Sequence, residues 1–263
     1  MPTSVSTTEL AYDARGWGVP VILLHGLTFN RATWAPIIER LGEGVRAVAI
    51  DLPGHGASPG DPRSLWEVAA LVHDLTDRLE IERPIVVGHS MSSGIASIYA
   101  ASYPTLGVVS IDQSTDLRRL AQIMRSLEPT LRGPSFTEAF QPFQKSMGLD
   151  RVPEPMRSRV LAGQRLRQEI VIGYWEEMMR TDPQEMQERV DDVARRIGCP
   201  YLAVFGRGLE QSERQQMTAL MPTIQIEEWP GSGHFVHLAE LERFNERLLA
   251  FIEGCASEYR DRR

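Results

Sequence analysis

The chain has 263 residues, 42% of them hydrophobic, and a formal net charge of -7. This length suits one large domain or a core with an insertion, and the acidic balance argues against nucleic acid or an anionic membrane as a partner. Cys199 and Cys255 form no CxxC or Cys/His cluster, so neither a disulfide framework nor a metal site is predicted. The absence of a signal-peptide pattern and of a long apolar run favours a cytoplasmic location without a membrane span.

The first part of the chain predicts strands separated by helices. Residues 7–15 alternate weakly and indicate an edge hairpin before a buried strand at 20–24. A second buried strand is predicted at 45–50. Residues 64–80 have apolar side chains at helical spacing, and Ser64 with Glu67 forms a capping-box pattern at the start of that helix.

Two loops follow these strands. His25-Gly-Leu27 ends the first strand, where a turn can direct the N–H of Leu27 above the sheet, and His25 is predicted to support that turn. Asp51 and His55 lie in a second turn rich in Gly and Pro. A metal or acid/base role is possible for this pair, but no further ligands flank it. We therefore favour a structural role, in which Asp51 holds loop N–H groups.

The stretch from Pro84 to Gly94 combines a β-branched apolar run, a tight Gly-His-Ser-Met-Ser turn and small residues at helical spacing. A serine at such a strand-to-helix corner is held with its Oγ exposed above the sheet, as in the G-x-S-x-G nucleophile elbow. Ser90 is therefore the candidate nucleophile. Ser92 replaces the second glycine of that pattern. An oxyanion needs two N–H donors, and these are predicted to come from Leu27 and Met91.

Residues 106–111 predict another buried strand, with Asp112 at its carboxyl end, where ligand groups gather in open parallel sheets. Residues 113–198 then show no convincing strand. Helical repeats, one long or broken helix at 153–181 and an N-cap at Asp182 predict an all-helical lid there. The core would comprise residues 1–112 and 199–263. The lid holds six of the ten methionines, which suit an adaptable apolar wall.

The last part of the chain returns to strands, at 200–205 and 223–229, before a final amphipathic helix. His234 lies between the last strand and this helix, in a glycine-rich loop that can reach over the sheet. The order serine, acid, histidine along the chain is the order that a nucleophile-elbow hydrolase requires. His234 is therefore the candidate base, and His237 is predicted to pack or cap at the start of the helix.

These motifs resemble the α/β-hydrolase superfamily, in its small single-domain branch with a helical cap. The resemblance covers nearly the whole chain and rests on His25-Gly26, the 51–58 turn, Gly88-His-Ser-Met-Ser92 and Gly233-His-Phe-Val-His237. It implies an α/β fold: a mostly parallel central sheet flanked by helices, with an inserted all-helical lid. It also implies Ser90 and His234 as nucleophile and base and the N–H groups of Leu27 and Met91 as the oxyanion hole. No metal or organic cofactor is implied.

The sequence departs from this family at the triad acid. Most members place an aspartate where this chain has Leu209. Two substitutes remain, Asp112 and Glu210. Asp112 follows a buried strand beside the elbow and would be held rigidly, whereas Glu210 follows a loop with two glycines. We therefore predict Asp112 as the acid and keep Glu210 as the alternative.

The first functional hypothesis is a serine esterase or lactonase that acts through an acyl-enzyme on Ser90. Its substrate would be a small apolar ester or lactone with a compact acyl group. The second is a non-catalytic or weakly catalytic small-molecule binding protein on a hydrolase scaffold. In that case, Ser92 and Leu209 depart from the family pattern because catalytic activity is no longer required. A cofactor-free perhydrolase and a carbon–carbon bond hydrolase share the motifs and stay open. The oligomeric state is not determined by the sequence.

Overall fold

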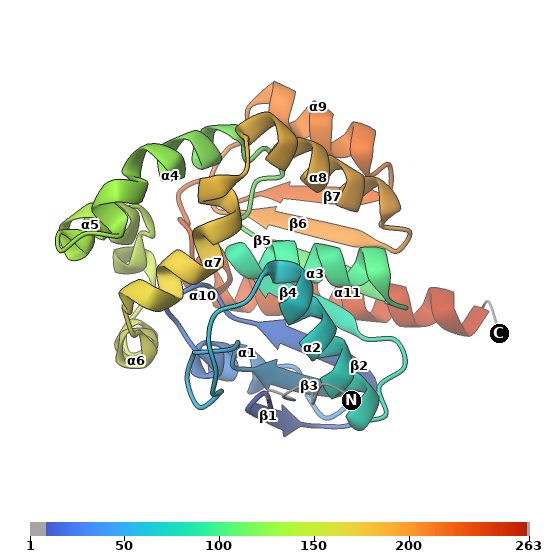
Figure 1. Cartoon of the computed structure of the whole chain (residues 1–263). Helices are drawn as coiled ribbons and strands as arrows, with labels where there is room; N and C mark the ends of the chain where they lie inside the picture. Colours follow the sequence, from blue (N-terminus) through green and yellow to red (C-terminus); the bar gives the residue numbers. More distant parts are fainter. Residues whose placement is uncertain (1–8, 262–263) are drawn as a thin grey trace, which may run out of the picture.

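A computed structural model describes residues 9–261, and its centre is a seven-stranded sheet (Figure 1). The strand order is β1-β3-β2-β4-β5-β6-β7. Strands β2 to β7 run parallel, and only β1 is antiparallel to its neighbour. The strands are β1 Tyr12–Arg15, β2 Val19–Leu24, β3 Val45–Ile50, β4 Ile85–His89, β5 Gly107–Ile111, β6 Tyr201–Phe205 and β7 Ile224–Glu228. The predicted α/β architecture is confirmed.

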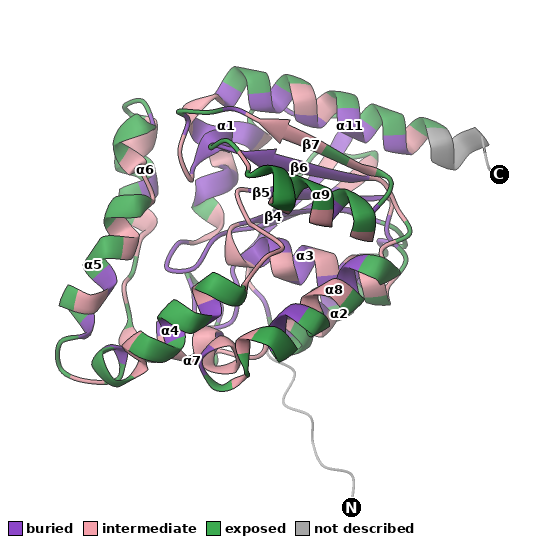
Figure 2. Cartoon of the chain, turned by 90° about the horizontal axis from the view of Figure 1, so that it is seen from above, coloured by how far each residue is buried: buried purple, intermediate pink, exposed green. Residues whose placement is uncertain are grey.

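Helices cover both faces of this sheet and bury two apolar layers (Figure 2). One layer lies under α2, α3, α8 and α9, and the other under α1 and α11. The bounds are α1 Ala35–Ile38, α2 Leu65–Arg78, α3 Met91–Ser102, α8 Pro183–Arg196, α9 Gln211–Leu220, α10 Val236–Ala239 and α11 Leu241–Asp261. The central strands β4, β5 and β6 are buried at every residue, as a parallel sheet covered on both faces requires.

Two local capping signals in the sequence are confirmed. Ser64 accepts from the Glu67 N–H, and the Glu67 carboxylate accepts in return from the Ser64 N–H, so the capping box at the start of α2 is complete. Asp182 caps α8 by accepting from the N–H groups of Gln184 and Glu185. These side chains bond within four residues of themselves, which is why the sequence alone predicts them.

The hairpin predicted within residues 7–15 is wrong, because the described residues of this stretch form a single strand, β1. β1 pairs antiparallel with β3, so that Tyr12 lies opposite Ile50. β2 is already paired on both sides, by β3 and β4, and has no free edge for β1. Residues 7 and 8 of the predicted hairpin lie outside the described part of the chain.

A run of helices separates β5 from β6 in the chain, and we call residues 113–198 the helical insertion. It contains α4 Arg118–Leu131, α5 Phe136–Ser146, α6 Met156–Gly163, α7 Gln168–Arg180 and α8, with a short 3-10 helix, η2 Leu149–Arg151. The helix predicted over 153–181 is broken into α6 and α7. In Figure 1, α4 to α7 lie beyond the carboxyl ends of the strands.

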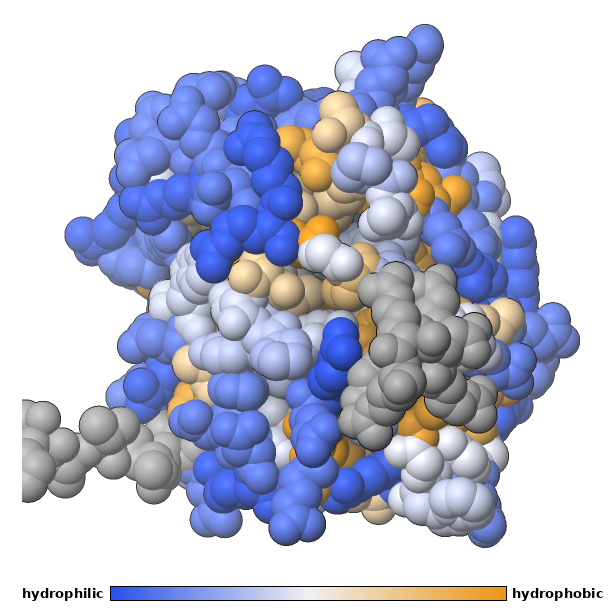
Figure 3. Space-filling model, turned by 90° about the vertical axis from the view of Figure 1, so that its right-hand side faces the viewer, coloured by the Kyte–Doolittle hydropathy of each residue, from blue (hydrophilic) through white to orange (hydrophobic). Residues whose placement is uncertain are grey.

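The opposite side of the molecule faces the viewer in Figure 3. Its surface is mostly hydrophilic, with apolar side chains scattered among the charged ones. Within residues 9–261, none of the helices combines the length and the apolar character that crossing a membrane requires.

Candidate active site

Ser90 lies at the corner between β4 and α3. Its backbone has φ 56° and ψ -130°, a strained conformation for a residue with a side chain. The Ser90 N–H donates to the Ile111 carbonyl at 2.9 Å, which fixes the corner against the end of β5. A Cβ added at Gly88 would lie 2.2 Å from the Ser92 carbonyl oxygen, so the tight turn requires a glycine two residues before the serine.

We expect Gly88→Ala to prevent this turn and to lower the free energy of unfolding by about 3 kcal/mol or more, because the added methyl group meets backbone atoms that cannot move independently. Gly254→Ala is the matched control. Gly254 is exposed in α11 with nothing within 4 Å of an added Cβ, so alanine there should stabilise the protein by up to about 1 kcal/mol. Urea unfolding of both variants measures the two effects, and equal shifts would contradict this account of Gly88.

The loop after β2 is held against the elbow by buried hydrogen bonds. His25 is fully buried; its Nε2 accepts from the Leu52 N–H at 3.1 Å, and its Nδ1 donates to the Gly26 carbonyl at 2.8 Å. The Ser92 hydroxyl donates to the His25 carbonyl at 2.5 Å. Ser92 therefore ties α3 to the loop that carries Leu27. Leu27, Ser90 and Met91 line one cavity.

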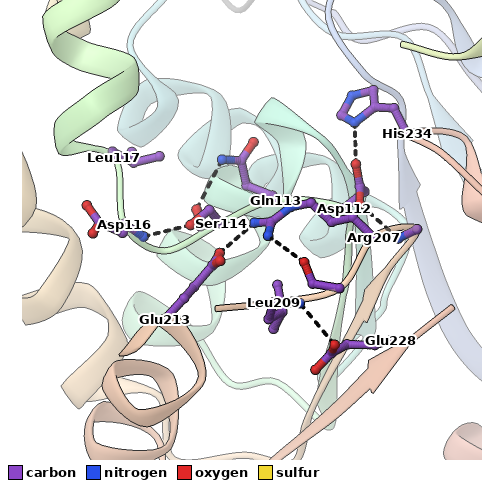
Figure 4. Close-up of polar contacts among 12 residues, drawn as sticks. Asp112, Gln113, Ser114, Asp116, Leu117, Arg207, Leu209, Glu213, Glu228 and His234 are labelled. Carbon is purple, nitrogen blue, oxygen red and sulfur yellow. Dashed lines mark hydrogen bonds and ion pairs between the residues drawn. The ribbon is translucent and has the colours of Figure 1, made fainter. Parts of the chain in front are cut away.

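Asp112 lies against His234 (Figure 4). The Nδ1 of His234 is 2.7 Å from Oδ2 of Asp112, and the Gly206 N–H donates to the other carboxylate oxygen at 2.9 Å. Burial by itself raises the pKa of Asp112, but the hydrogen bond with His234 and the Gly206 N–H outweigh it, so that the pKa lies below its usual value. Asp112 is thus an ionised acceptor that orients the imidazole.

Glu210 is not part of this arrangement. It precedes α9 as its N-cap residue, its side chain is exposed, and it is not among the residues that line the cavity. Leu209, at the position where the family usually has its acid, donates its N–H to Glu228 at 2.9 Å (Figure 4). Two residues before Leu209, Arg207 points its guanidinium at Glu213, 2.7 Å away.

His89 was not singled out from the sequence, although it directly precedes the candidate nucleophile. It is buried at the end of β4, and its Nε2 donates to the His234 carbonyl at 2.9 Å. The His89 and His234 rings are 4.8 Å apart between centroids. His89 therefore holds the backbone of the histidine loop directly beside the elbow. The only feature of the sequence that could have indicated this role is that His89 directly precedes Ser90.

The cavity above Ser90 has a volume of about 890 Å³. Core residues Ser90, Asp112 and His234 lie on its wall together with aromatic and methionine side chains of the helical insertion. The latter are Phe140, Phe143, Met147, Tyr174, Trp175, Met178 and Met186. The site is thus a mostly apolar chamber with a small set of polar groups at one place, the usual form of a small-molecule site.

Asp51 and His55 have structural contacts. Asp51 is fully buried and accepts from the N–H groups of Arg31 at 2.7 Å and Ala57 at 2.8 Å, and it pairs with the Arg31 guanidinium. His55 accepts from the Thr28 N–H at 3.3 Å. Across residues 9–261, no cluster of His, Cys, Asp or Glu has an arrangement that could hold a metal ion. The structural interpretation of Asp51 is confirmed.

Several buried histidines make stability depend on pH. Burial lowers the pKa of His25 to about 4 and that of His55 and His237 to about 3. The unfolded chain binds protons at these residues below pH ~6.5, whereas the folded chain does not, so the unfolded state gains stability as pH falls. We expect the free energy of unfolding to decrease between pH 6.5 and 5 with a slope that steepens to about 1.4 kcal/mol per pH unit for each such histidine.

His237→Leu tests this expectation, because neither ring nitrogen of His237 has a hydrogen-bond partner among the described residues. Leucine there leaves no other polar group unpaired. Urea unfolding of the wild type and the variant at pH 6.5, 5.75 and 5 should give a shallower slope for the variant, by about 1.4 kcal/mol per pH unit. Parallel slopes would contradict a neutral, buried His237.

The fold and this site define a hydrolase-type scaffold with a serine at its nucleophile elbow. The model of the alpha/beta hydrolase family matches residues 21–247, and the chain belongs to that family. An uncharacterized protein of Mycobacterium tuberculosis is 28% identical over 278 residues, which cover 92% of this chain and 78% of that protein.

Solved structures show the same fold. The enol-lactonase from Burkholderia xenovorans LB400 superimposes with a TM-score of 0.77 at 17% identity and covers 95% of this chain and 99% of its own. A thermophilic esterase from Thermogutta terrifontis gives a TM-score of 0.69 at 21% identity, with 94% and 93% covered. At these identities, the likeness concerns the fold alone.

Proposed function

We propose that this protein is a serine hydrolase that cleaves a small apolar carboxylic ester or lactone through an acyl-enzyme on Ser90. The observation that carries the proposal is the 2.7 Å contact between Asp112 and His234 on the wall of the cavity that also contains Ser90. A nucleophile, a base and an acid that orients the base are the parts that acyl transfer requires. Membership of the alpha/beta hydrolase family supports hydrolysis as the reaction class.

In the proposed mechanism, Nε2 of His234 accepts the Ser90 hydroxyl proton while Oγ attacks the substrate carbonyl. Asp112 holds Nδ1–H and stabilises the imidazolium that forms. The N–H groups of Leu27 and Met91 bind the oxyanion, where each donor contributes about 3 kcal/mol to transition-state stabilisation. His234 then protonates the leaving group. In the second half of the reaction, His234 accepts a proton from water, the water oxygen attacks the acyl carbonyl, and Ser90 leaves with the proton returned by His234.

The helical insertion, residues 113–198, supplies the roof of this proposed site. Its aromatic and methionine side chains exclude water from the reaction and provide an adaptable wall. Tyr174 connects the roof to the core, because its hydroxyl donates to the Pro53 carbonyl at 3.0 Å. We therefore assign residues 1–112 and 199–263 as the catalytic core and the insertion as its cap.

A binding protein without catalysis has less support. The two departures from the family pattern have structural counterparts, since Ser92 bonds the His25 carbonyl and Asp112 contacts His234 in place of an acid at position 209. Neither departure therefore favours lost catalysis.

Labelling with a fluorophosphonate separates these alternatives, because the probe requires an activated serine. We expect rapid modification of the wild type at Ser90, and slow or no modification of His234→Ala. A panel of p-nitrophenyl esters and lactones run beside it should show turnover. An inert wild type in both assays would overturn the proposal.

A further inference from the structure

The cavity extends beyond the candidate nucleophile along one face of α3. The α3 residues on its wall are Met91, Ser93, Gly94, Ser97 and Ile98, which recur at intervals of three and four and so share one side of the helix. From Met91 to Ile98 the helix advances by ~10 Å. The cavity therefore reaches about two helical turns past Ser90. We call this part the inner channel.

Helix α8 forms the opposite wall of the inner channel. Val190, Val193, Ala194 and Ile197 lie on the cavity wall, again at intervals of three and four. α8 packs against α3, and the two helices lie near each other in Figure 2. Both helices lead from the carboxyl edge of the sheet toward its amino edge, because α3 follows β4 and α8 precedes β6. The channel thus runs between two helices of the same direction.

The floor of the channel gives an independent length. Gly206 follows the carboxyl end of β6, Tyr201 is the first residue of that strand, and both line the cavity. Four residues lie between them, and five residue steps of strand span ~16 Å. Ser110 of β5 lies between these levels, opposite Ala203 of β6. The helix therefore gives a channel length of ~10 Å, and the two ends of the strand give an upper limit of ~16 Å.

The polar groups at the inner end are satisfied within the protein. The Ser97 hydroxyl donates to the Ser93 carbonyl at 2.8 Å, so its contact of 3.0 Å with Tyr201 is one in which the tyrosine donates. Burial raises the pKa of Tyr201, which keeps the phenol neutral. Around them the wall is apolar, formed by Ile98, Val193, Ala194, Ile197 and Met221. An apolar ligand end loses no hydrogen bond there.

An empty space in a protein interior is costly, at about 24 cal/mol per Å³ in core cavities. Here small residues line the space on both helices: Ser97 on α3 and Ala194 on α8. A larger side chain at either position would fill the gap and improve packing. A channel that is continuous with the reactive serine and has small residues on both walls is the form of a ligand site.

We propose that the inner channel binds an extended, unbranched apolar acyl chain, so that the substrate is a medium-chain acyl ester or lactone and not one with the compact acyl group expected from sequence. This inference rests on the proposed function of Ser90. A chain that follows the wall for ~10 Å has about eight carbons at roughly 1.3 Å of length per carbon. Ala194 and Ile197 would set its maximum length.

The test is the value of kcat/KM for p-nitrophenyl esters from acetate to dodecanoate. In the wild type, we expect it to rise roughly fourfold per methylene to about C8 and then to level off. Ala194→Phe fills the inner end of the channel and should lower the octanoate-to-butyrate ratio about a hundredfold. Asp192→Phe places the same ring on the exposed side of α8 and should leave the ratio unchanged.

Ile197→Ala is the control for the possibility that Ala194→Phe loses activity because it misfolds. It lengthens the inner end and should move the preferred chain toward dodecanoate, a gain that damage to the fold cannot produce. A wild type that prefers acetate, or chain preferences that are the same in all variants, would overturn the channel proposal.

Binding of the carboxylic acids separates this proposal from that of the reaction. Thermal unfolding is measured with acetate and with octanoate, and we expect octanoate to raise the midpoint in the wild type but not in Ala194→Phe. Stabilisation by octanoate without turnover of any ester would overturn the hydrolase and support the channel. Turnover that does not depend on chain length would support the hydrolase and overturn the channel. A protein that shows no binding of octanoate and no turnover would overturn both proposals.

Discussion

Ser90→Ala is expected to lower kcat for ester hydrolysis by about 10⁶, because the acyl-enzyme cannot form without Oγ. The proposed N–H donors of Leu27 and Met91 would still bind the substrate carbonyl. KM should therefore change far less than kcat. Initial rates on the best ester of the panel, with wild-type contamination excluded by titration of active sites, measure the effect.

Ser102→Ala is the matched control for this variant. It makes the same substitution at the other end of α3, at an exposed residue that does not line the cavity. Its kcat should equal that of the wild type. Turnover by Ser90→Ala within tenfold of the wild type would exclude Ser90 as the nucleophile, since no hydroxyl in the elbow could replace it at that rate.

Asp112→Asn should lower kcat by about 10⁴, as loss of the triad acid does in serine proteases. The amide keeps the shape of the carboxylate but presents either an N–H or an uncharged oxygen to Nδ1 of His234. It therefore favours the wrong tautomer and no longer stabilises the imidazolium. The same variant also loses an ionised acceptor for the Gly206 N–H, so its thermal unfolding is measured in parallel.

Glu210→Gln makes the equivalent change at the alternative acid. Its side chain is exposed and lies outside the cavity, and we expect turnover within about twofold of the wild type. Near-normal activity in Asp112→Asn together with collapse in Glu210→Gln would reverse the assignment. A large loss in both variants would require that the loop after β6 moves Glu210 toward the site during the reaction.

Some parts of the fold and site follow from short-range patterns. The run 85–87 is apolar and β-branched and forms a strand, and the sharp turn at Ser90 follows from glycine and small residues within a few positions. The Ser64 and Glu67 box and the Asp182 cap likewise involve neighbours in sequence. Ser90 and His234 were identified in this way, since each belongs to a local motif with its own backbone requirement.

Which element each strand or side chain contacts is harder to predict from the sequence. β1 is short and exposed at all four residues, so its sequence carries no preference for β2 over β3, and its pairing depends on which sheet edge stays open. The choice between Asp112 and Glu210 also depends on contacts between segments far apart in the chain. Both are acids near strand ends, and only the assembled sheet places one of them against a histidine 122 residues away.

The sequence by itself determined the α/β class, the order of strands and helices, the elbow with Ser90 and the histidine loop, because these depend on periodicity and turn chemistry within a few residues. Tertiary structure alone decided which carboxylate meets His234, that Ser92 bonds the His25 carbonyl, and that the cavity continues between α3 and α8. Those features depend on distances between segments far apart in the chain. Such distances are set by the packing of the sheet and its helices, which no local pattern records.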